Sequence, residues 1–138
     1  MLARLSASTV VAVVAGYLFS DGFNRTVDFV GPLDYMPHPI IAAESALLAV
    51  AAVLLGVALL VGWRRALSLT KLYLWFEILA SALVLCFVLF GLLEPDLYFC
   101  VRVFLKAALS FALILLLRRP DVQTGFMEES PQEDLTNR

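Results

Sequence analysis

The sequence has few charged residues, and this scarcity decides its broad class. Only 16% of the 138 residues are Asp, Glu, Lys or Arg, whereas 62% are hydrophobic, and the mean hydropathy is +0.90. Soluble domains have about 25% charged and roughly 45–50% apolar residues. The composition therefore excludes an ordinary soluble domain and indicates an integral membrane protein. We expect membrane lipid as a partner and no nucleic acid.

Histidine and cysteine are also scarce, which restricts metal and cofactor chemistry. His38 is the only histidine, so the chain cannot supply a bis-histidine haem site or a His-rich metal site. Cys86 and Cys100 form no CxxC pair, so they indicate neither a disulfide framework nor a metal knot. We expect no metal and no cofactor, and we interpret both cysteines as small apolar side chains.

Four long apolar segments are the main feature that is present. Each is close to the roughly 20 residues that cross a hydrocarbon core about 30 Å thick. They run over residues 5–20, 39–62, 72–93 and 97–117. We therefore predict an all-α, polytopic membrane protein, with a left-handed bundle of four transmembrane helices in residues 1–119. A signal peptide is the alternative for the first segment, because Met1–Arg4 form a short basic start.

The positions of the cations predict the orientation of these segments, since Lys and Arg near membrane ends favour the cytoplasmic side. If the segments alternate in direction, six cations fall on one side: Arg4, Arg64, Arg65, Lys71, Arg118 and Arg119. The opposite connections carry Arg25 among five acidic residues. We predict that both termini are cytoplasmic.

Two stretches outside the segments are more polar. In the first outer connection, over residues 21–39, Gly31, Pro32, Pro37 and Pro39 prevent a long helix. We predict a bent interfacial loop there that caps the bundle, or alternatively a lid over a substrate or partner. The acidic tail over residues 120–138 cannot bury enough apolar surface to fold alone, so we predict disorder in the cytoplasm, or alternatively a docking peptide.

Small residues predict where helices meet, because in lipid they let backbones approach closely. They recur at four-residue spacing in three segments: Ser8, Ala12 and Gly16; Ser45 and Ala49, then Ala52 and Gly56; Ala108 and Ala112. We predict that each set forms a helix-packing face, either within the chain or between copies of it, and the first set is the strongest indication.

Four ionisable residues fall within the predicted spans: Glu44, Glu77, Arg102 and Lys106. At a rise of about 1.5 Å per residue, Glu44 and Arg102 both lie roughly 7 Å below the outer edge, and Lys106 lies about 12–14 Å below it. Their side chains lean the same way, toward the N-terminal end of each helix. We therefore predict a pair between Glu44 and Arg102 with Lys106 beneath it.

Glu77 is expected to stand apart from this pair. It lies about 8 Å from the inner edge of the third predicted segment and leans toward the cytoplasm. A contact with Lys106 would require both side chains to bend against their preferred direction. We expect Glu77 to face Arg64, Arg65 or Lys71, to extend to the interface, or to stay protonated.

Polar residues recur at four-residue spacing beside these charges. Arg102, Lys106 and Ser110 form one stripe, and Glu77 and Ser81 form another, so both stripes are expected to face away from lipid. One interpretation is an internal ion-pair lock that fixes helix order. The other is a polar path or pocket for a proton, an anion or an anionic head group.

A loose resemblance concerns the end of the fourth segment, "LLLRRPDVQTGF", residues 115–126, and the basic link "GWRRALSLTKLYLWFE". The ending has Arg-Pro, an acid, Val and a nearby Phe, and with the link it resembles small bacterial four-helix inner-membrane proteins of uncharacterised function. The resemblance covers about a quarter of the chain. It implies a bacterial inner membrane and no particular activity.

Known reaction motifs are missing from the sequence. It has no G-x-S-x-G and no phosphate-binding glycine loop, and Glu44 and Glu77 are expected near opposite edges, too far apart for paired acid–base catalysis. Our leading hypothesis is a non-enzymatic structural or accessory subunit, with other membrane subunits or further copies of the chain as open partners. The alternative is a small transporter or ion-conducting protein that uses the four charges, and a weaker one is an enzyme acting on lipid.

Overall fold

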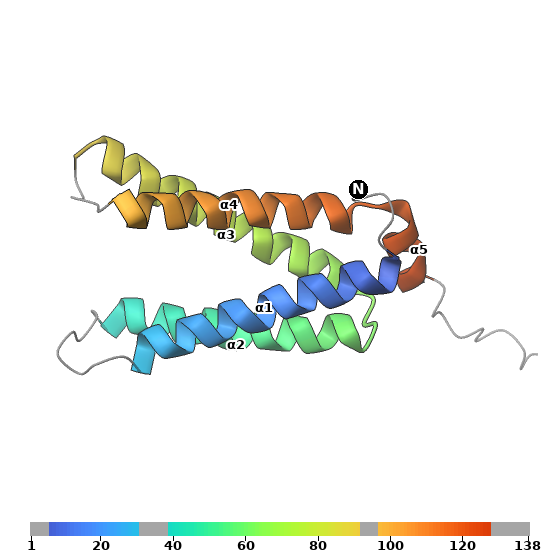
Figure 1. Ribbon diagram of the computed structural model, residues 1–138. Coiled ribbons are helices and arrows are strands. Elements are labelled where there is room, and N and C mark those ends of the chain that lie inside the picture. The colour runs from blue at the N-terminus through green and yellow to red at the C-terminus, as the bar shows by residue number, and fades with distance from the viewer. Residues whose placement is uncertain (1–5, 31–38, 92–96, 128–138) are drawn as a thin grey trace, which may run out of the picture.

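The computed structural model describes residues 6–30, 39–91 and 97–127, and in these residues it is helical, with no strand. Figure 1 shows five helices in chain order: α1 (Ala7–Val30), α2 (Pro39–Leu60), α3 (Ala66–Leu89), α4 (Leu97–Leu117) and α5 (Pro120–Met127). The predicted all-α class is confirmed.

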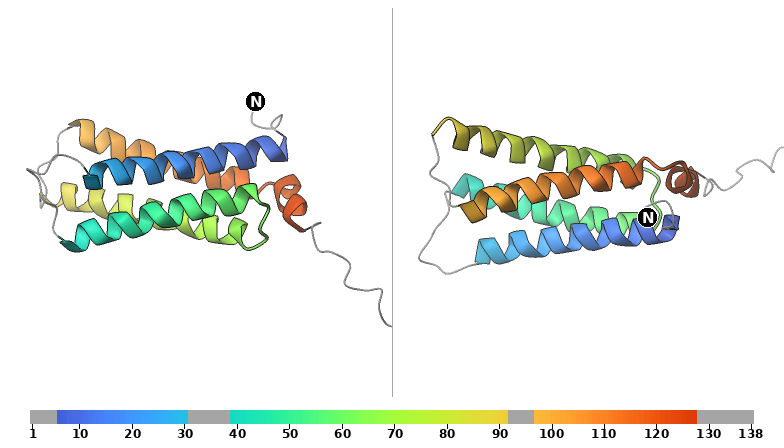
Figure 2. Two further views of the ribbon diagram at one scale, coloured as in Figure 1. Left: turned by 90° about the horizontal axis from the view of Figure 1, so that it is seen from below. Right: turned by 45° about the horizontal axis from the view of Figure 1, so that its top comes forward.

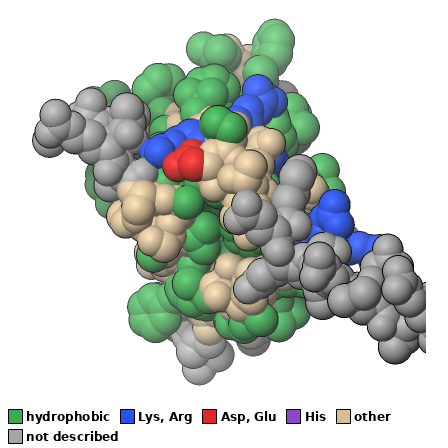
Figure 3. Space-filling model, turned by 90° about the vertical axis from the view of Figure 1, so that its right-hand side faces the viewer, with side chains coloured by type: hydrophobic (Ala, Val, Ile, Leu, Met, Phe, Trp, Pro, Cys, Tyr) green, Lys and Arg blue, Asp and Glu red, His purple; other side chains and the backbone are tan. Residues whose placement is uncertain are grey.

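The four long helices lie side by side as two hairpins, α1 with α2 and α3 with α4, and the closest packing is within each hairpin (Figures 1 and 2). The start of α1, the link between α2 and α3, and α5 lie at one end of the molecule. Figure 3, which views this end, shows Lys and Arg side chains in several places and hydrophobic side chains along its margins.

Three helices are long and apolar enough to cross a membrane: α2 in its part Ala43–Leu60, α3 and α4. Large apolar side chains such as Leu54, Leu79 and Phe104 are exposed on their outer faces. Apolar surface on this scale marks a face that meets lipid or another protein. The fourth predicted span falls in α1, which is long enough but less apolar, because it continues past residue 20 through Asp21, Asn24 and Arg25.

Two predicted helix boundaries are wrong. Residues 21–30, assigned to the outer loop, continue α1, and no proline precedes Pro32 in the sequence. The third helix begins at Ala66 rather than residue 72, directly after a turn in which Gly62 has a positive φ of 80°. The Gly62 and Trp63 amides donate to the Leu59 and Ala58 carbonyls, which ends α2 abruptly. Residues 31–38 lie outside the described residues.

The tail also differs from the prediction. Pro120–Met127 form α5 rather than a disordered segment, and α5 packs against α1. Val122 is 1% exposed and Phe126 is 8% exposed, so two apolar residues four apart give this short helix a buried face. The rest of the tail, residues 128–138, lies outside the described residues.

A small apolar core runs between the hairpins. It includes Val10, Val14, Leu18, Ala52, Leu59, Leu74, Leu113, Ile114 and Leu117. The predicted packing faces are correct on α2, where Ala49 and Ala52 are buried and Gly56 lies against the ring of Phe19.

The predicted packing faces of α1 and α4 do not pack against the described helices of this chain. Ser8, Ala12, Gly16, Ala108 and Ala112 are exposed. On α1 the buried stripe is instead Val10, Val14 and Leu18, whose larger side chains fill the space between helices. The close approach of α1 to α2 occurs farther along, at Gly22, where an added Cβ would lie 2.9 Å from Val53 Cγ2 and 3.1 Å from the Ala49 carbonyl oxygen.

Gly22 and Gly16 make a matched pair for testing this packing. We predict that Gly22→Ala unfolds more easily than Gly16→Ala by about 1–3 kcal/mol, the usual cost of overpacking. Both changes add the same methyl group to α1, but at Gly16 nothing lies within 4 Å of the added atom. Denaturant titration of the purified protein in detergent micelles measures the difference. Equal free energies of unfolding would mean that α1 and α2 are not in close contact at Gly22.

Candidate functional site: a charge quartet between the hairpins

Four ionisable side chains from three helices form a closed ring of alternating sign, here called the charge quartet: Asp21 and Arg25 of α1, Glu77 of α3 and Lys106 of α4. Lys106 Nζ lies 2.9 Å from Asp21 Oδ1 and 2.6 Å from Glu77 Oε2. Arg25 Nε lies 3.1 Å from Asp21 Oδ2, and Arg25 Nη2 contacts Glu77 Oε1. Each carboxylate therefore contacts both cations.

The quartet is largely buried. The side chains of Glu77 and Asp21 are 3% and 8% exposed, and those of Arg25 and Lys106 are 18% and 31% exposed. A buried charge is costly unless it is paired and hydrogen-bonded. Two carboxylates facing two cations balance the formal charge, and the ring geometry gives every member two partners.

The helices place these side chains through simple spacings. Asp21 and Arg25 are four residues apart, so they lie on one face of α1. Glu77 is the twelfth residue of α3 and Lys106 the tenth residue of α4, so both lie near the middle of their helices. Because α3 and α4 form a hairpin, these two positions come to the same level.

Hydroxyl groups surround the ring. The Tyr73 hydroxyl donates to Asp21 Oδ2 at 2.5 Å, and Tyr73 stands one turn before Glu77 on α3. The Tyr17 hydroxyl is hydrogen-bonded to Ser110 Oγ at 3.2 Å, one turn beyond Lys106 on α4. Polar side chains at four-residue spacing on α1, α3 and α4 thus meet in one internal site.

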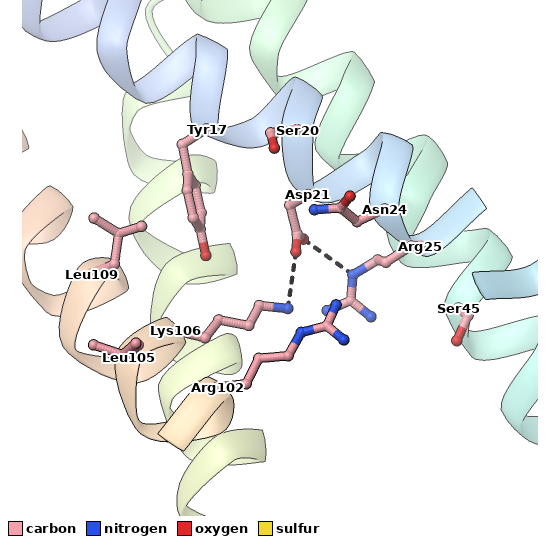
Figure 4. A pocket seen from close by; sticks show the side chains of 10 residues that line it. All are labelled: Tyr17, Ser20, Asp21, Asn24, Arg25, Ser45, Arg102, Leu105, Lys106 and Leu109. Carbon is pink, nitrogen blue, oxygen red and sulfur yellow. Dashed lines mark hydrogen bonds and ion pairs between the residues drawn. The ribbon is translucent and has the colours of Figure 1, made fainter. Parts of the chain in front are cut away.

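A pocket of about 380 Å³ adjoins the quartet between α1 and α4 (Figure 4). The side chains of Arg25, Arg102 and Lys106 extend into the space between the two helices. The pocket is lined by Tyr17, Ser20, Asp21, Asn24, Arg25, Ser45, Arg102, Leu105, Lys106 and Leu109. Its charged lining thus comprises three cations and one carboxylate.

The structure does not bring together the predicted pair of Glu44 and Arg102. Both side chains are exposed, and neither forms an ion pair with any residue that the structure describes. Lys106 pairs with Glu77 instead, although the sequence argument disfavoured that contact. The error lies in the start of α3, because six more residues at its beginning move Glu77 from near the edge to mid-helix.

Asp21, Arg25, Tyr17 and Tyr73 were not among the predicted site residues. The first two were assigned to a loop and so received no helical spacing. Tyr17, Asp21 and Arg25 follow one another at four-residue intervals, so they share one face if this stretch is a helix. This spacing is the signal that could have identified them. The predicted internal positions of Ser81 and Ser110 are confirmed, since they are 6% and 0% exposed.

The predicted cytoplasmic anchors lie toward the end that carries α5. Arg64 and Arg65 are exposed in the α2–α3 link and line a second pocket of about 720 Å³ with Gln123 and Phe126. Lys71 is half-buried in the second turn of α3, and Arg118 is exposed. Arg119 Nη2 lies 2.8 Å from Asp121 Oδ2.

Among the described residues there is no group of three or more His, Cys, Asp or Glu side chains that could hold a metal ion. Comparison with protein-family models, with curated proteins and with solved structures finds no match to this chain. The resemblance to small bacterial membrane proteins therefore stays a prediction. The chain is, on its fold and composition, an all-helical protein with three helices suited to crossing a membrane.

Lys106 tests whether the quartet stabilises the fold. We predict that Lys106→Met lowers the free energy of unfolding by about 3 kcal/mol, because breaking a buried ion pair leaves uncompensated charge. Asp21 and Glu77 would then share only Arg25. Arg102→Met, one turn away on the same helix, is the control and should change stability by less than about 0.5 kcal/mol. Unfolding by SDS titration in mixed micelles measures both, and equal losses would contradict a stabilising role for the quartet.

Proposed function

We propose that this chain is a non-enzymatic membrane protein of a bacterial inner membrane, a four-helix bundle that serves as a structural or accessory subunit. The observation that carries the proposal is the closed ring of the quartet. Each of its carboxylates is contacted by both of its cations. Such a ring joins α1 of one hairpin to α3 and α4 of the other, as an internal lock would.

We take α1 to be the fourth span. Its 24 residues correspond to roughly 36 Å of helix, enough to cross a hydrocarbon core of about 30 Å. It lies beside α2, and its Asp21 and Arg25 face the other helices rather than the outside. Polar groups within a span are tolerated when they face the interior and pair with one another.

The positions of the cations support the proposed orientation. Arg64, Arg65 and Arg118 lie at or near the end that carries the start of α1 and also α5. Since Lys and Arg near membrane ends favour the cytoplasmic side, this end is assigned to the cytoplasm. Both termini are then cytoplasmic.

The energetics of insertion support an assembly role for the quartet. A Lys or Arg at a helix centre costs about 2.5–3.5 kcal/mol on insertion scales. Lys106 lies near the centre of α4 and carries that cost until it meets Glu77 of α3 and Asp21 of α1. The ring therefore stabilises one arrangement of the hairpins, the one in which the charged faces of α1, α3 and α4 contact one another.

A small transporter is the second candidate, and one observation favours it. The pocket of about 380 Å³ reaches Asp21, Arg25 and Lys106, so three members of the ring are accessible from one side. A proton or an anion entering there would meet titratable groups at mid-helix. In that case Glu77 and Lys106 would change partners during transport rather than hold the fold.

A double-mutant cycle with Glu77→Gln and Lys106→Gln separates the two candidates. For a lock, the sum of the losses of unfolding free energy in the two single variants exceeds the loss in the double variant. The difference, which is the coupling energy, should be roughly 0.5–3 kcal/mol. In proteoliposomes under a pH gradient, wild type and double variant should then pass protons at the same rate. Proton flux that is present in wild type and absent in Glu77→Gln, with unchanged stability, would instead favour the transporter.

A further inference from the structure

The pocket beside the quartet is lined by one cation, Arg102, that is not a member of the quartet. Arg25 and Lys106 are each paired with both Asp21 and Glu77. Arg102 also lines the pocket, and it forms no ion pair with any residue in the described ranges 6–30, 39–91 and 97–127. Because the quartet is balanced, Arg102 gives the site a net charge of +1.

Arg102 shares this pocket with the two quartet cations. Figure 4 shows the side chains of Arg102, Arg25 and Lys106 extending into the same space between α1 and α4. Three cations that line one pocket attract anions, and Coulomb attraction is stronger where water is partly excluded. A guanidinium presents a planar fork of donors that matches the oxygens of a phosphate or carboxylate. The charge and the donor type together indicate an oxyanion.

Neutral polar groups complete the lining. Ser20 and Asn24 of α1 and Ser45 of α2 border the pocket. Their hydroxyl and amide groups can donate hydrogen bonds to anion oxygens or to the hydroxyls of a polar head group. The volume of about 380 Å³ lies within the roughly 300–1,000 Å³ of small-molecule sites. It is larger than an isolated phosphate needs.

One wall of the pocket is apolar and faces outward. Leu105 and Leu109 of α4 line it and are 59% and 48% exposed. They lie on a helix that is suited to crossing a membrane, so their exposed surfaces meet acyl chains if α4 is in a bilayer. A ligand with an anionic head and an apolar chain would satisfy both kinds of surface at once.

We propose that this pocket binds the oxyanion of an anionic amphiphile, with its phosphate or carboxylate on Arg102 and its apolar chain along Leu105 and Leu109. The proposal rests on the proposed membrane location of the helices. The quartet cations Arg25 and Lys106 reinforce the potential of the site, while Arg102 supplies the donors that no described partner occupies.

Phosphatidylglycerol retention tests the assignment. Four proteins are reconstituted into nanodiscs of phosphatidylcholine with a small share of phosphatidylglycerol: wild type, Arg102→Gln, Arg102→Lys and Arg118→Gln. Native mass spectrometry after release then counts the bound lipid. We expect wild type to retain one phosphatidylglycerol, Arg102→Gln to retain about tenfold less, as loss of one charged hydrogen bond implies, and Arg102→Lys to recover part of it.

A control variant, Arg118→Gln, and a competitor, inorganic phosphate, show whether the retained lipid is bound in this pocket. Arg118→Gln removes an exposed cation outside the pocket and should retain lipid as wild type does. Equal losses in Arg118→Gln and Arg102→Gln would overturn the site, because general surface charge would then explain the binding. Displacement of the lipid by inorganic phosphate would overturn the amphiphile and leave a free oxyanion as the ligand.

The stability of the same variants separates this inference from the proposed function. Arg102→Gln in phosphatidylcholine alone should unfold as wild type does, because Arg102 takes no part in the ring. Lost stability in Arg102→Gln would place it in the fold instead and contradict a binding role. If lipid retention fails while Lys106→Met still destabilises the protein, the pocket assignment fails and the lock remains.

Discussion

In the proposed lock, the arrangement of the helices depends on the need to neutralise four charges in an apolar environment. Asp21, Arg25, Glu77 and Lys106 come from three helices, and only α1 carries a pair of opposite charge. Asp21 and Arg25 pair within α1, yet Arg25 also takes Glu77 and Asp21 also takes Lys106. Separating the hairpins would leave Glu77 and Lys106 with each other but would remove one of the two ion pairs of each carboxylate.

The surrounding packing positions this ring rather than supplying its specificity. Gly22, one residue after Asp21, lets α1 approach α2 closely. Phe19, two residues before Asp21, packs its ring against Gly56 of α2. Tyr73 and Ser110, each one turn from a quartet member, direct hydroxyl groups toward the same interior. The apolar core occupies much of the remaining interior, while large apolar side chains cover the outside of α2, α3 and α4.

Composition and apolar run length were enough to predict the helical class, and for α4 the bounds at residues 97 and 117 as well. The site was not predictable in the same way, because depth was counted from the ends of apolar runs. Helices continue until backbone geometry stops them, so α1 extends to Val30 and α3 begins at Ala66. That difference brings Asp21 and Arg25 into a helix and Glu77 to mid-level. Which of Glu44 or Glu77 meets Lys106 depends on helix rotation, which hydrophobicity alone does not fix.

The central claim is that Lys106 bridges two carboxylates inside the bundle. Lys71 and Lys106 are the only lysines, so a Lys71→Arg variant isolates the signal of Lys106 Nζ. Solid-state NMR in lipid bilayers, with carboxyl ¹³C placed first in Asp and then in Glu, measures the dipolar coupling of each to ¹⁵Nζ. Strong coupling in both samples is predicted by the contacts of 2.9 Å to Asp21 and 2.6 Å to Glu77. Strong coupling in only one sample, or in neither, would contradict the bridging role of Lys106.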